Sequence, residues 1–100
     1  MPTEDEILQA LRVVNDPEVG VNLVDLGLIY AVEIEGANVR VVMTMTTPAC
    51  PMHSYLTEEA RDAIRKQCGD VENLQVELVW EPPWSPQMIS DTGKRQLGWL

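Results

Sequence analysis

Two alternating apolar segments on either side of a short turn constrain the fold of this chain most strongly. An extended chain over residues 28–34 would carry four apolar side chains on one face, those of Leu28, Tyr30, Val32 and Ile34. The alternation recurs over residues 39–46, where one face would carry Val39, Val41, Met43 and Met45. The intervening Glu35-Gly36-Ala37-Asn38 contains residues that are typical of turns. The sequence therefore predicts an antiparallel hairpin with one apolar face.

Helical spacing of apolar residues flanks this hairpin on both sides. Thr3 with Glu6 three positions later is the pattern of a capping box, and apolar residues follow at helical intervals: Ile7, Leu8, Leu11 and Val14. We expect this first helix to end before Pro17, because proline disfavours helical geometry in the residue before it. A second helix is predicted over residues 51–68, with Gly69 as its C-cap and an inward stripe of Leu56, Ala60, Ala63 and Ile64.

A third strand is predicted from Leu74 to Trp80, with an inward face of Leu74, Val76, Leu78 and Trp80. A proline-rich rigid turn follows, after which Ser85 would cap a short last helix that has Pro86 at its first position. The order α-β-β-α-β-α predicts an α+β fold, a two-layer α/β sandwich with a small mixed three-stranded sheet. We expect a single domain over residues 1–100, with a right-handed crossover if the second and third strands are parallel.

Composition and charge exclude several classes of protein. The chain has 100 residues, 45% of them hydrophobic, and a formal net charge of -9, so it lacks the positive footprint of a protein that binds nucleic acid or an anionic membrane. No apolar run approaches the roughly 20 residues of a membrane span. Residues 1–6 are acidic where a secretion signal is basic. We therefore expect a cytoplasmic protein, in which the two cysteines stay free thiols.

Cys50 lies between Pro48 and Pro51 at the predicted start of the second helix. Pro51 suits the first helical position, which makes Cys50 the N-cap or its neighbour. The unpaired N–H groups and the positive end of the helix dipole would favour a thiolate there, whereas a lone cysteine can also be a small buried hydrophobe. A disulfide with Cys68 is excluded, because a helix over 51–68 would separate the two sulfurs by roughly 27 Å. We expect Cys68 to close the helix and pack into the core.

His53, the single histidine, follows Cys50 by three positions, so both side chains can face one side of the first helical turn. The two are candidate metal ligands, although two ligands do not complete a tetrahedral zinc site. Alternatively, His53 is an exposed helix residue. The pair also suggests a cysteine nucleophile with its base, but the sequence shows no third group that would orient the base.

Two acidic residues and a proline-rich corner are further candidates. Asp16 is typical of a turn residue, and the alternative is that it lies near Cys50 and helps to bind a metal or to orient a partner. Asp25 is interpreted as a turn residue. We expect Trp84, which lies past the third strand, to be exposed, and an exposed indole beside Ser85 would suit a protein–protein contact. A pure adaptor protein is therefore another alternative.

Four segments occur in this order: DPE at 16–18, NLVDLGLIY at 22–30, MTMTTPACP at 43–51 and VWEPPWSP at 79–86. Together they resemble the SufT/PaaD-like family of iron–sulfur cluster assembly proteins, relatives of a eukaryotic cytosolic iron–sulfur targeting factor. The resemblance covers nearly the whole chain. PaaD-type members, which serve an aromatic-ring monooxygenase system, usually carry an added cysteine-rich C-terminal segment that this sequence lacks, so we expect a different role.

The resemblance implies a small α/β domain akin to the cluster-assembly fold and a role in the maturation of iron–sulfur proteins. It maps the reactive cysteine of the family onto Cys50 and its acidic turn motif onto Asp16 and Glu18, and it includes Thr47 as a further candidate. The implied partners are the assembly machinery and client apoproteins. Two chains of a homodimer could each donate Cys50 to a labile iron or [2Fe–2S] unit. Alternatively, Cys50 contacts a client transiently and never holds metal.

Overall fold

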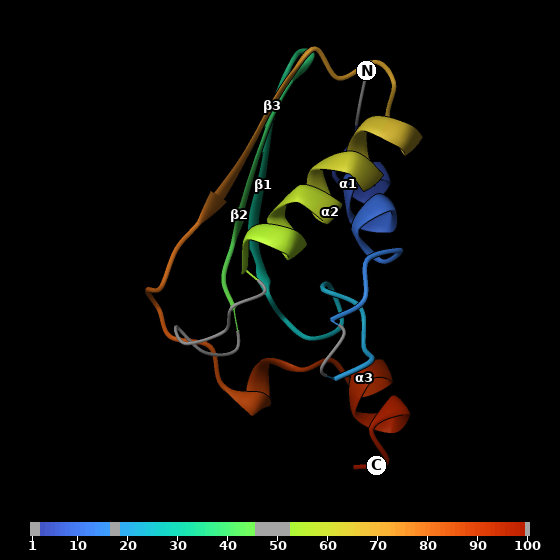
Figure 1. Ribbon diagram of the computed structural model, residues 1–100, viewed down its shortest axis with the longest axis vertical. Coiled ribbons are helices and arrows are strands. Elements are labelled where there is room, and N and C mark those ends of the chain that lie inside the picture. The colour runs from blue at the N-terminus through green and yellow to red at the C-terminus, as the bar shows by residue number, and fades with distance from the viewer. Residues whose placement is uncertain (1–2, 17–18, 46–52, 100) are drawn as a thin grey trace.

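The computed structural model describes residues 3–16, 19–45 and 53–99. Its elements, in chain order, are α1 (Glu4–Leu11), β1 (Ile29–Glu35), β2 (Asn38–Met43), α2 (His53–Gln67), β3 (Asn73–Leu78), the 3-10 helix η1 (Pro86–Met88) and α3 (Asp91–Gln96). The helices α1 and α2 pack together on one face of the sheet, and the segment with η1 and α3 lies beyond one end of it (Figure 1). The predicted α+β class and the order of helices and strands are confirmed.

The sheet has the order β1-β2-β3, with β1 antiparallel and β3 parallel to the central β2. This is the small mixed sheet that the sequence predicted. The turn between β1 and β2 consists of Gly36 and Ala37. Gly36 has a φ of 61°, a left-handed conformation that costs glycine little because it has no Cβ.

A bulge interrupts the predicted alternation along β1. Ile29 is opposite Met43, but the next aligned pair is Ala31 and Val42, so Tyr30 is an extra residue on the β1 side. Ile29 therefore shares the inward face of Met43, where the predicted alternation did not place it. An insertion of this kind shifts the side-chain alternation by one place.

The hydrophobic core lies between the sheet and the two longer helices. β2 directs three buried side chains at the helices, those of Val39, Val41 and Met43. The helices contribute buried side chains from both predicted stripes, including Ile7, Leu11, Leu56, Ala60 and Ile64, and Ala10 is buried beside them. Full burial of one large aliphatic side chain stabilises a fold by about 1.5–3 kcal/mol, so this layer accounts for much of the stability. Within the described ranges, no helix has the length and apolar character needed to cross a membrane.

The first helix begins where the sequence predicted and ends earlier. The Oγ1 atom of Thr3 accepts a hydrogen bond from the N–H of Glu6 at 3.2 Å, so Thr3 is the N-cap. α1 ends at Leu11, before Val14. Val14 is buried all the same. Its carbonyl accepts a hydrogen bond from the N–H of Leu23 at 3.0 Å, which ties the chain after α1 to the loop that leads to β1.

The second cysteine closes α2, as predicted. Cys68 follows the last helical residue, and its N–H donates to the carbonyl of Ile64 at 2.7 Å. Its side chain is buried in the core cluster. Gly69 lies in the turn that follows, without the positive φ of a left-handed C-cap, so the expected glycine cap is not formed there.

The third strand stops short of its predicted end. β3 ends at Leu78, and the N–H of Val79 makes one further bond of 2.8 Å to the carbonyl of Met43, the last residue of β2. The ladder therefore stops before Trp80. Trp80 is 38% exposed, so the prediction that it belongs to the core is wrong.

Candidate functional site at the carboxyl end of the sheet

The described chain on either side of the segment with Cys50 lies at the end of the sheet where the parallel strands β2 and β3 have their carboxyl ends. α2 begins at His53 at this same end, and the described chain before it stops at the buried Met45 (Figure 1). The candidates Thr47 and Cys50 lie outside the described residues, and so does Glu18. The structure thus shows a helix, α2, that begins three positions after Cys50 in the sequence.

A buried hydroxyl borders this segment. Thr44 is fully buried, and its N–H donates to the carbonyl of Leu28 at 2.8 Å. Its Oγ1 atom has no hydrogen-bond partner among the residues that the structure describes. Burial of a hydroxyl without a partner is costly, and a threonine at this place is consistent with a polar environment at the end of β2.

Asp16 lies in a buried turn of the loop that joins α1 to β1. Its side chain is 3% exposed, and Oδ1 accepts a hydrogen bond from the N–H of Val19 at 3.3 Å. The backbone of Asp16 forms a bond in each direction, from its N–H to Val21 at 3.0 Å and from the N–H of Gly20 to its carbonyl at 2.7 Å. This geometry matches the turn role that the sequence indicated for Asp16.

Asp25 has a larger role than its interpretation as a turn residue. It is 9% exposed, and Oδ2 accepts from Nδ2 of Asn22 at 2.6 Å while Oδ1 accepts from the hydroxyl of Ser90 at 2.8 Å. The N–H of Ser90 also donates to the carbonyl of Asp25, at 2.7 Å. Ser90 in turn caps α3, since its Oγ accepts from the N–H of Gly93 at 3.0 Å. Asp25 therefore fixes the C-terminal helix on the first loop.

Trp84 is a second anchor of the C-terminal segment, and its predicted exposure is wrong. The side chain is half-buried against the core, and its Nε1–H donates to the carbonyl of Leu26 at 2.7 Å. Burial is favourable here because the indole N–H keeps a hydrogen-bond partner. Close by along the chain, the hydroxyl of Tyr30 donates to the carbonyl of Pro82 at 2.7 Å, next to a cis bond between Glu81 and Pro82.

Ser85 occupies the predicted N-cap position with Pro86 after it, but the element that follows is the short η1. Its side chain makes no capping hydrogen bond, and the last α-helix is capped by Ser90 instead. A serine followed by Asp91 in the first turn is itself an N-cap signal. That local signal could have located α3, whereas nothing local indicates the bond from Ser90 to Asp25.

The thiol that the structure describes, that of Cys68, is buried and free. Burial raises the pKa of Cys68 above its usual value, and the negative charges of Glu6 and Asp70 raise it further. The thiol is therefore protonated at neutral pH, and a protonated, buried thiol is a poor nucleophile and a poor metal ligand. Cys50, for which the sequence predicts the reactive role, lies outside the described residues.

The described residues form no closed metal centre. Within 3–16, 19–45 and 53–99 there is no group of three or more His, Cys, Asp or Glu side chains that could hold a metal ion. A structural zinc site needs about four such ligands.

Comparison with known proteins identifies the family. Residues 4–77 match the family described as "Iron-sulfur cluster assembly protein". The chain belongs to this family. A protein of Porphyromonas gingivalis named "Fe-S protein maturation auxiliary factor" is 40% identical over 102 residues, which cover 100% of this chain and 95% of that protein. The "Fe-S protein maturation auxiliary factor SufT" of Staphylococcus aureus is 34% identical over 84 residues, which cover 83% of this chain and 94% of that protein.

The fold of the family is also known from solved structures. The crystal structure of a domain of unknown function, DUF59, from Bacillus anthracis has a TM-score of 0.90 to this chain, with 36% sequence identity, and the match covers 95% of this chain and 91% of that one. The resemblance to SufT-like assembly proteins, which the four sequence motifs predicted, is thus confirmed.

Proposed function

We propose that this protein is an auxiliary factor in the maturation of iron–sulfur proteins and that the thiolate of Cys50 is its working group. The observation that carries the proposal is the 40% identity, over the full length of the chain, to a protein named an Fe-S protein maturation auxiliary factor. Its partners are the cluster-assembly machinery and client apoproteins in the cytoplasm, and its role is carriage or targeting rather than catalysis.

The reactivity of Cys50 follows from its place before α2. The residue precedes the described start of this fifteen-residue helix by three positions. The amino end of a helix carries roughly half a unit of positive charge and unpaired N–H groups, which stabilise a thiolate over a thiol. The other end carries Arg65 and Lys66, whose positive charges suit the opposite pole of the helix dipole. The helix as a whole therefore favours an anion near Cys50.

The cargo is iron or an iron–sulfur cluster that is held loosely. One thiolate per chain does not complete a metal site, so ligation by Cys50 of two chains, with His53 as an additional ligand, leaves positions that a client can take over. In this proposal Asp16, Glu18 and Thr47 orient the partner or the cargo.

Anaerobic reconstitution with ferrous iron and sulfide tests this proposal directly. The wild type, Cys50→Ser and Cys68→Ser are compared by absorbance and by iron bound per chain. Cys68→Ser is the matched control, because it removes the buried thiol and leaves Cys50 in place. We expect Cys50→Ser alone to lose the bound iron. Equal iron in all three proteins would refute ligation by Cys50.

A cellular assay separates this proposal from the rival functions. The activity of an iron–sulfur enzyme is measured in cells that lack the protein and are supplied with each variant. We expect Cys50→Ser to fail and His53→Ala to retain most of the effect. Full rescue by Cys50→Ser would favour a pure adaptor. If Cys50→Ser and His53→Ala each failed to rescue, a cysteine nucleophile with its base would be favoured instead.

A further inference from the structure

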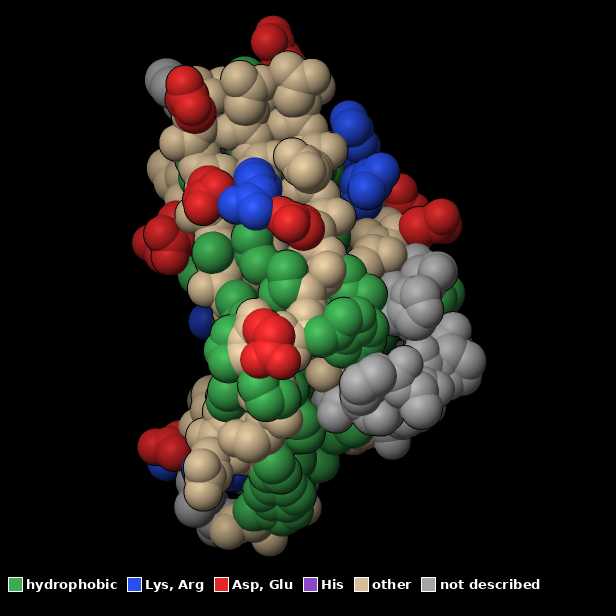
Figure 2. All heavy atoms as spheres, turned by 90° about the vertical axis from the view of Figure 1, so that its left-hand side faces the viewer, with side chains coloured by type: hydrophobic (Ala, Val, Ile, Leu, Met, Phe, Trp, Pro, Cys, Tyr) green, Lys and Arg blue, Asp and Glu red, His purple; other side chains and the backbone are tan. Residues whose placement is uncertain are grey.

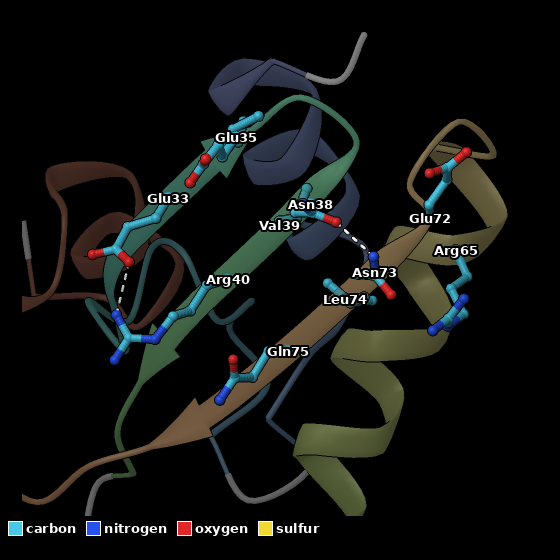
Figure 3. Close-up of a pocket in the computed structure, with 11 residues that line it drawn as sticks. Glu33, Glu35, Asn38, Val39, Arg40, Arg65, Glu72, Asn73, Leu74 and Gln75 are labelled. Atoms are coloured by element: carbon cyan, nitrogen blue, oxygen red, sulfur yellow. Dashed lines mark hydrogen bonds and ion pairs between the residues drawn. The ribbon is translucent and has the colours of Figure 1, made fainter.

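The sheet has an open face, defined as the side of β1, β2 and β3 that points away from α1 and α2 (Figure 2). One half of this face is polar and hollow. The hollow has a volume of about 460 Å³, and its polar lining includes Glu33, Glu35, Asn38, Arg40, Asn73 and Gln75 (Figure 3). The amide of Asn73 donates to Oδ1 of Asn38 at 2.6 Å across the two parallel strands.

The other half of the open face is apolar. In Figure 2 the hydrophobic side chains gather below a basic side chain flanked by carboxylates, and a further carboxylate lies among them. The register places Ala31 beside Val42 on this face, both half-buried, although none of the described helices packs on that side. Beyond the strand ends, Trp80 and Met88 are each 38% exposed, and Met88 Sδ lies 3.7 Å from the hydroxyl of Tyr30. The register also places Glu77 beside Val42 on this face, and Trp80 follows the last residue of β3 by two positions.

The charge of the open face is negative. Arg40 is bound on both sides, by Glu33 at 2.8 Å and by Glu77, and the hydrogen bonds to Glu33 and then to Glu77 raise the pKa of its guanidinium. The positive charge of Arg40 is thus matched by these two carboxylates. Glu35, Glu72 and Arg65 of α2 also line the hollow, so three carboxylates, with Glu33, are opposed there by two guanidinium groups.

We propose that the open face docks a polypeptide segment of a partner protein that carries exposed apolar side chains next to lysine or arginine. The apolar residues of that segment cover Trp80 and Val42, and its basic residues enter the hollow beside Glu35. Charge complementarity of this kind sets partner choice and association rate more than total affinity. The inference does not depend on the chemistry proposed for Cys50.

Charge also argues against a second copy of this chain as the occupant. Each chain has a formal net charge of -9. A two-fold symmetric contact through the open face would bring the same carboxylates of both copies together, and like charges that face one another oppose association. A basic segment relieves this repulsion, whereas a second copy doubles it.

Selection from a library of random peptides displayed on phage tests the proposal. The library is selected on the wild-type protein, and recovered peptides are synthesised and their affinities measured for the wild type, Trp80→Asp and Glu35→Lys. We expect enriched peptides to combine aromatic or aliphatic residues with lysine or arginine. Their affinity should fall by about tenfold or more in Trp80→Asp, the loss expected for a central interface residue. It should also fall in Glu35→Lys and as salt is raised.

Val13→Asp is the matched control, because Val13 is a 63% exposed apolar residue after α1, away from the open face. It should leave peptide affinity unchanged, and circular dichroism should show that all variants are folded. The proposal is overturned if no peptide is enriched, if the enriched peptides are acidic, or if they bind Trp80→Asp as well as the wild type. It is equally overturned if the wild type sediments as a dimer that Trp80→Asp converts to a monomer, since the occupant would then be a second copy.

Discussion

Replacement of Gly27 by alanine should be far more harmful than the same change at Gly20. Both glycines have a left-handed backbone, with φ of 77° at Gly27 and 81° at Gly20. A Cβ at Gly27 would lie 2.3 Å from the carbonyl oxygen of Met88 and 2.8 Å from its carbonyl carbon and Cβ, whereas a Cβ at Gly20 meets nothing within 4 Å. The two variants therefore share the backbone strain and differ only in the clash with η1.

The expected magnitudes follow from this difference. A left-handed conformation costs alanine about 1–2 kcal/mol, and the lower entropy of the unfolded chain offsets roughly 0.4–1 kcal/mol of that cost. Gly20→Ala should therefore lower the free energy of unfolding by about 0.5–1 kcal/mol. The atom that opposes a Cβ at Gly27 is backbone and cannot rotate away, so overpacking adds a further 1–3 kcal/mol or so there.

Urea unfolding followed by circular dichroism measures both values, and tryptophan fluorescence reports on the C-terminal segment. Since Trp84 is bonded to the residue before Gly27, its emission should change in the folded Gly27→Ala protein and not in Gly20→Ala. If the two variants lost the same stability within about 0.5 kcal/mol, the usual tolerance of such comparisons, the close approach of Met88 to Gly27 would not exist in solution.

Two further predictions concern buried groups. Asp25→Ala and Ser90→Ala should each destabilise the protein by about 1–3 kcal/mol, because each change breaks the same 2.8 Å hydrogen bond. A double-mutant cycle in urea should therefore give a coupling of about 1 kcal/mol between the two changes. Strict additivity of the two losses would contradict that bond. Cys68, whose folded-state pKa is raised above its usual 9.0, should contribute stability that is complete below that pH and is lost as pH rises toward the folded pKa. The alkaline loss should be smaller in Cys68→Ala, and an identical pH dependence in both proteins would argue against a buried, protonated thiol.

The sequence predicted best what depends on neighbouring residues. The hairpin of β1 and β2 follows from side-chain alternation around Gly36, and the start of α1 follows from the Thr3 side chain three positions from Glu6. Each of these signals acts within a few residues, and the structure shows the hairpin pairing and the Thr3 cap that the signals predict. The membership in the cluster-assembly family rested instead on four motifs taken together, which span nearly the whole chain.

The errors came from interactions between distant parts of the chain. Alternation alone placed Trp80 inside, but the end of a strand is set by the end of its neighbour, and β2 ends at Met43. Trp84 was expected in solvent because no local pattern reveals that the carbonyl of Leu26 lies within hydrogen-bond distance of its indole. The bulge at Tyr30 has the same origin, since it depends on how two strands align.

The bonds from the C-terminal segment to the first loop also set the order in which this protein can be completed. They join Tyr30 to Pro82, Leu26 to Trp84 and Asp25 to Ser90, residues that are 52, 58 and 65 positions apart. Such contacts close large loops and form late in folding. During synthesis, the carboxylate of Asp25 cannot bind Ser90 until residue 90 has left the ribosome. A nascent chain that stalls before this point would have α1, α2 and the hairpin but not the docked segment with η1 and α3. It would be the form most exposed to proteases.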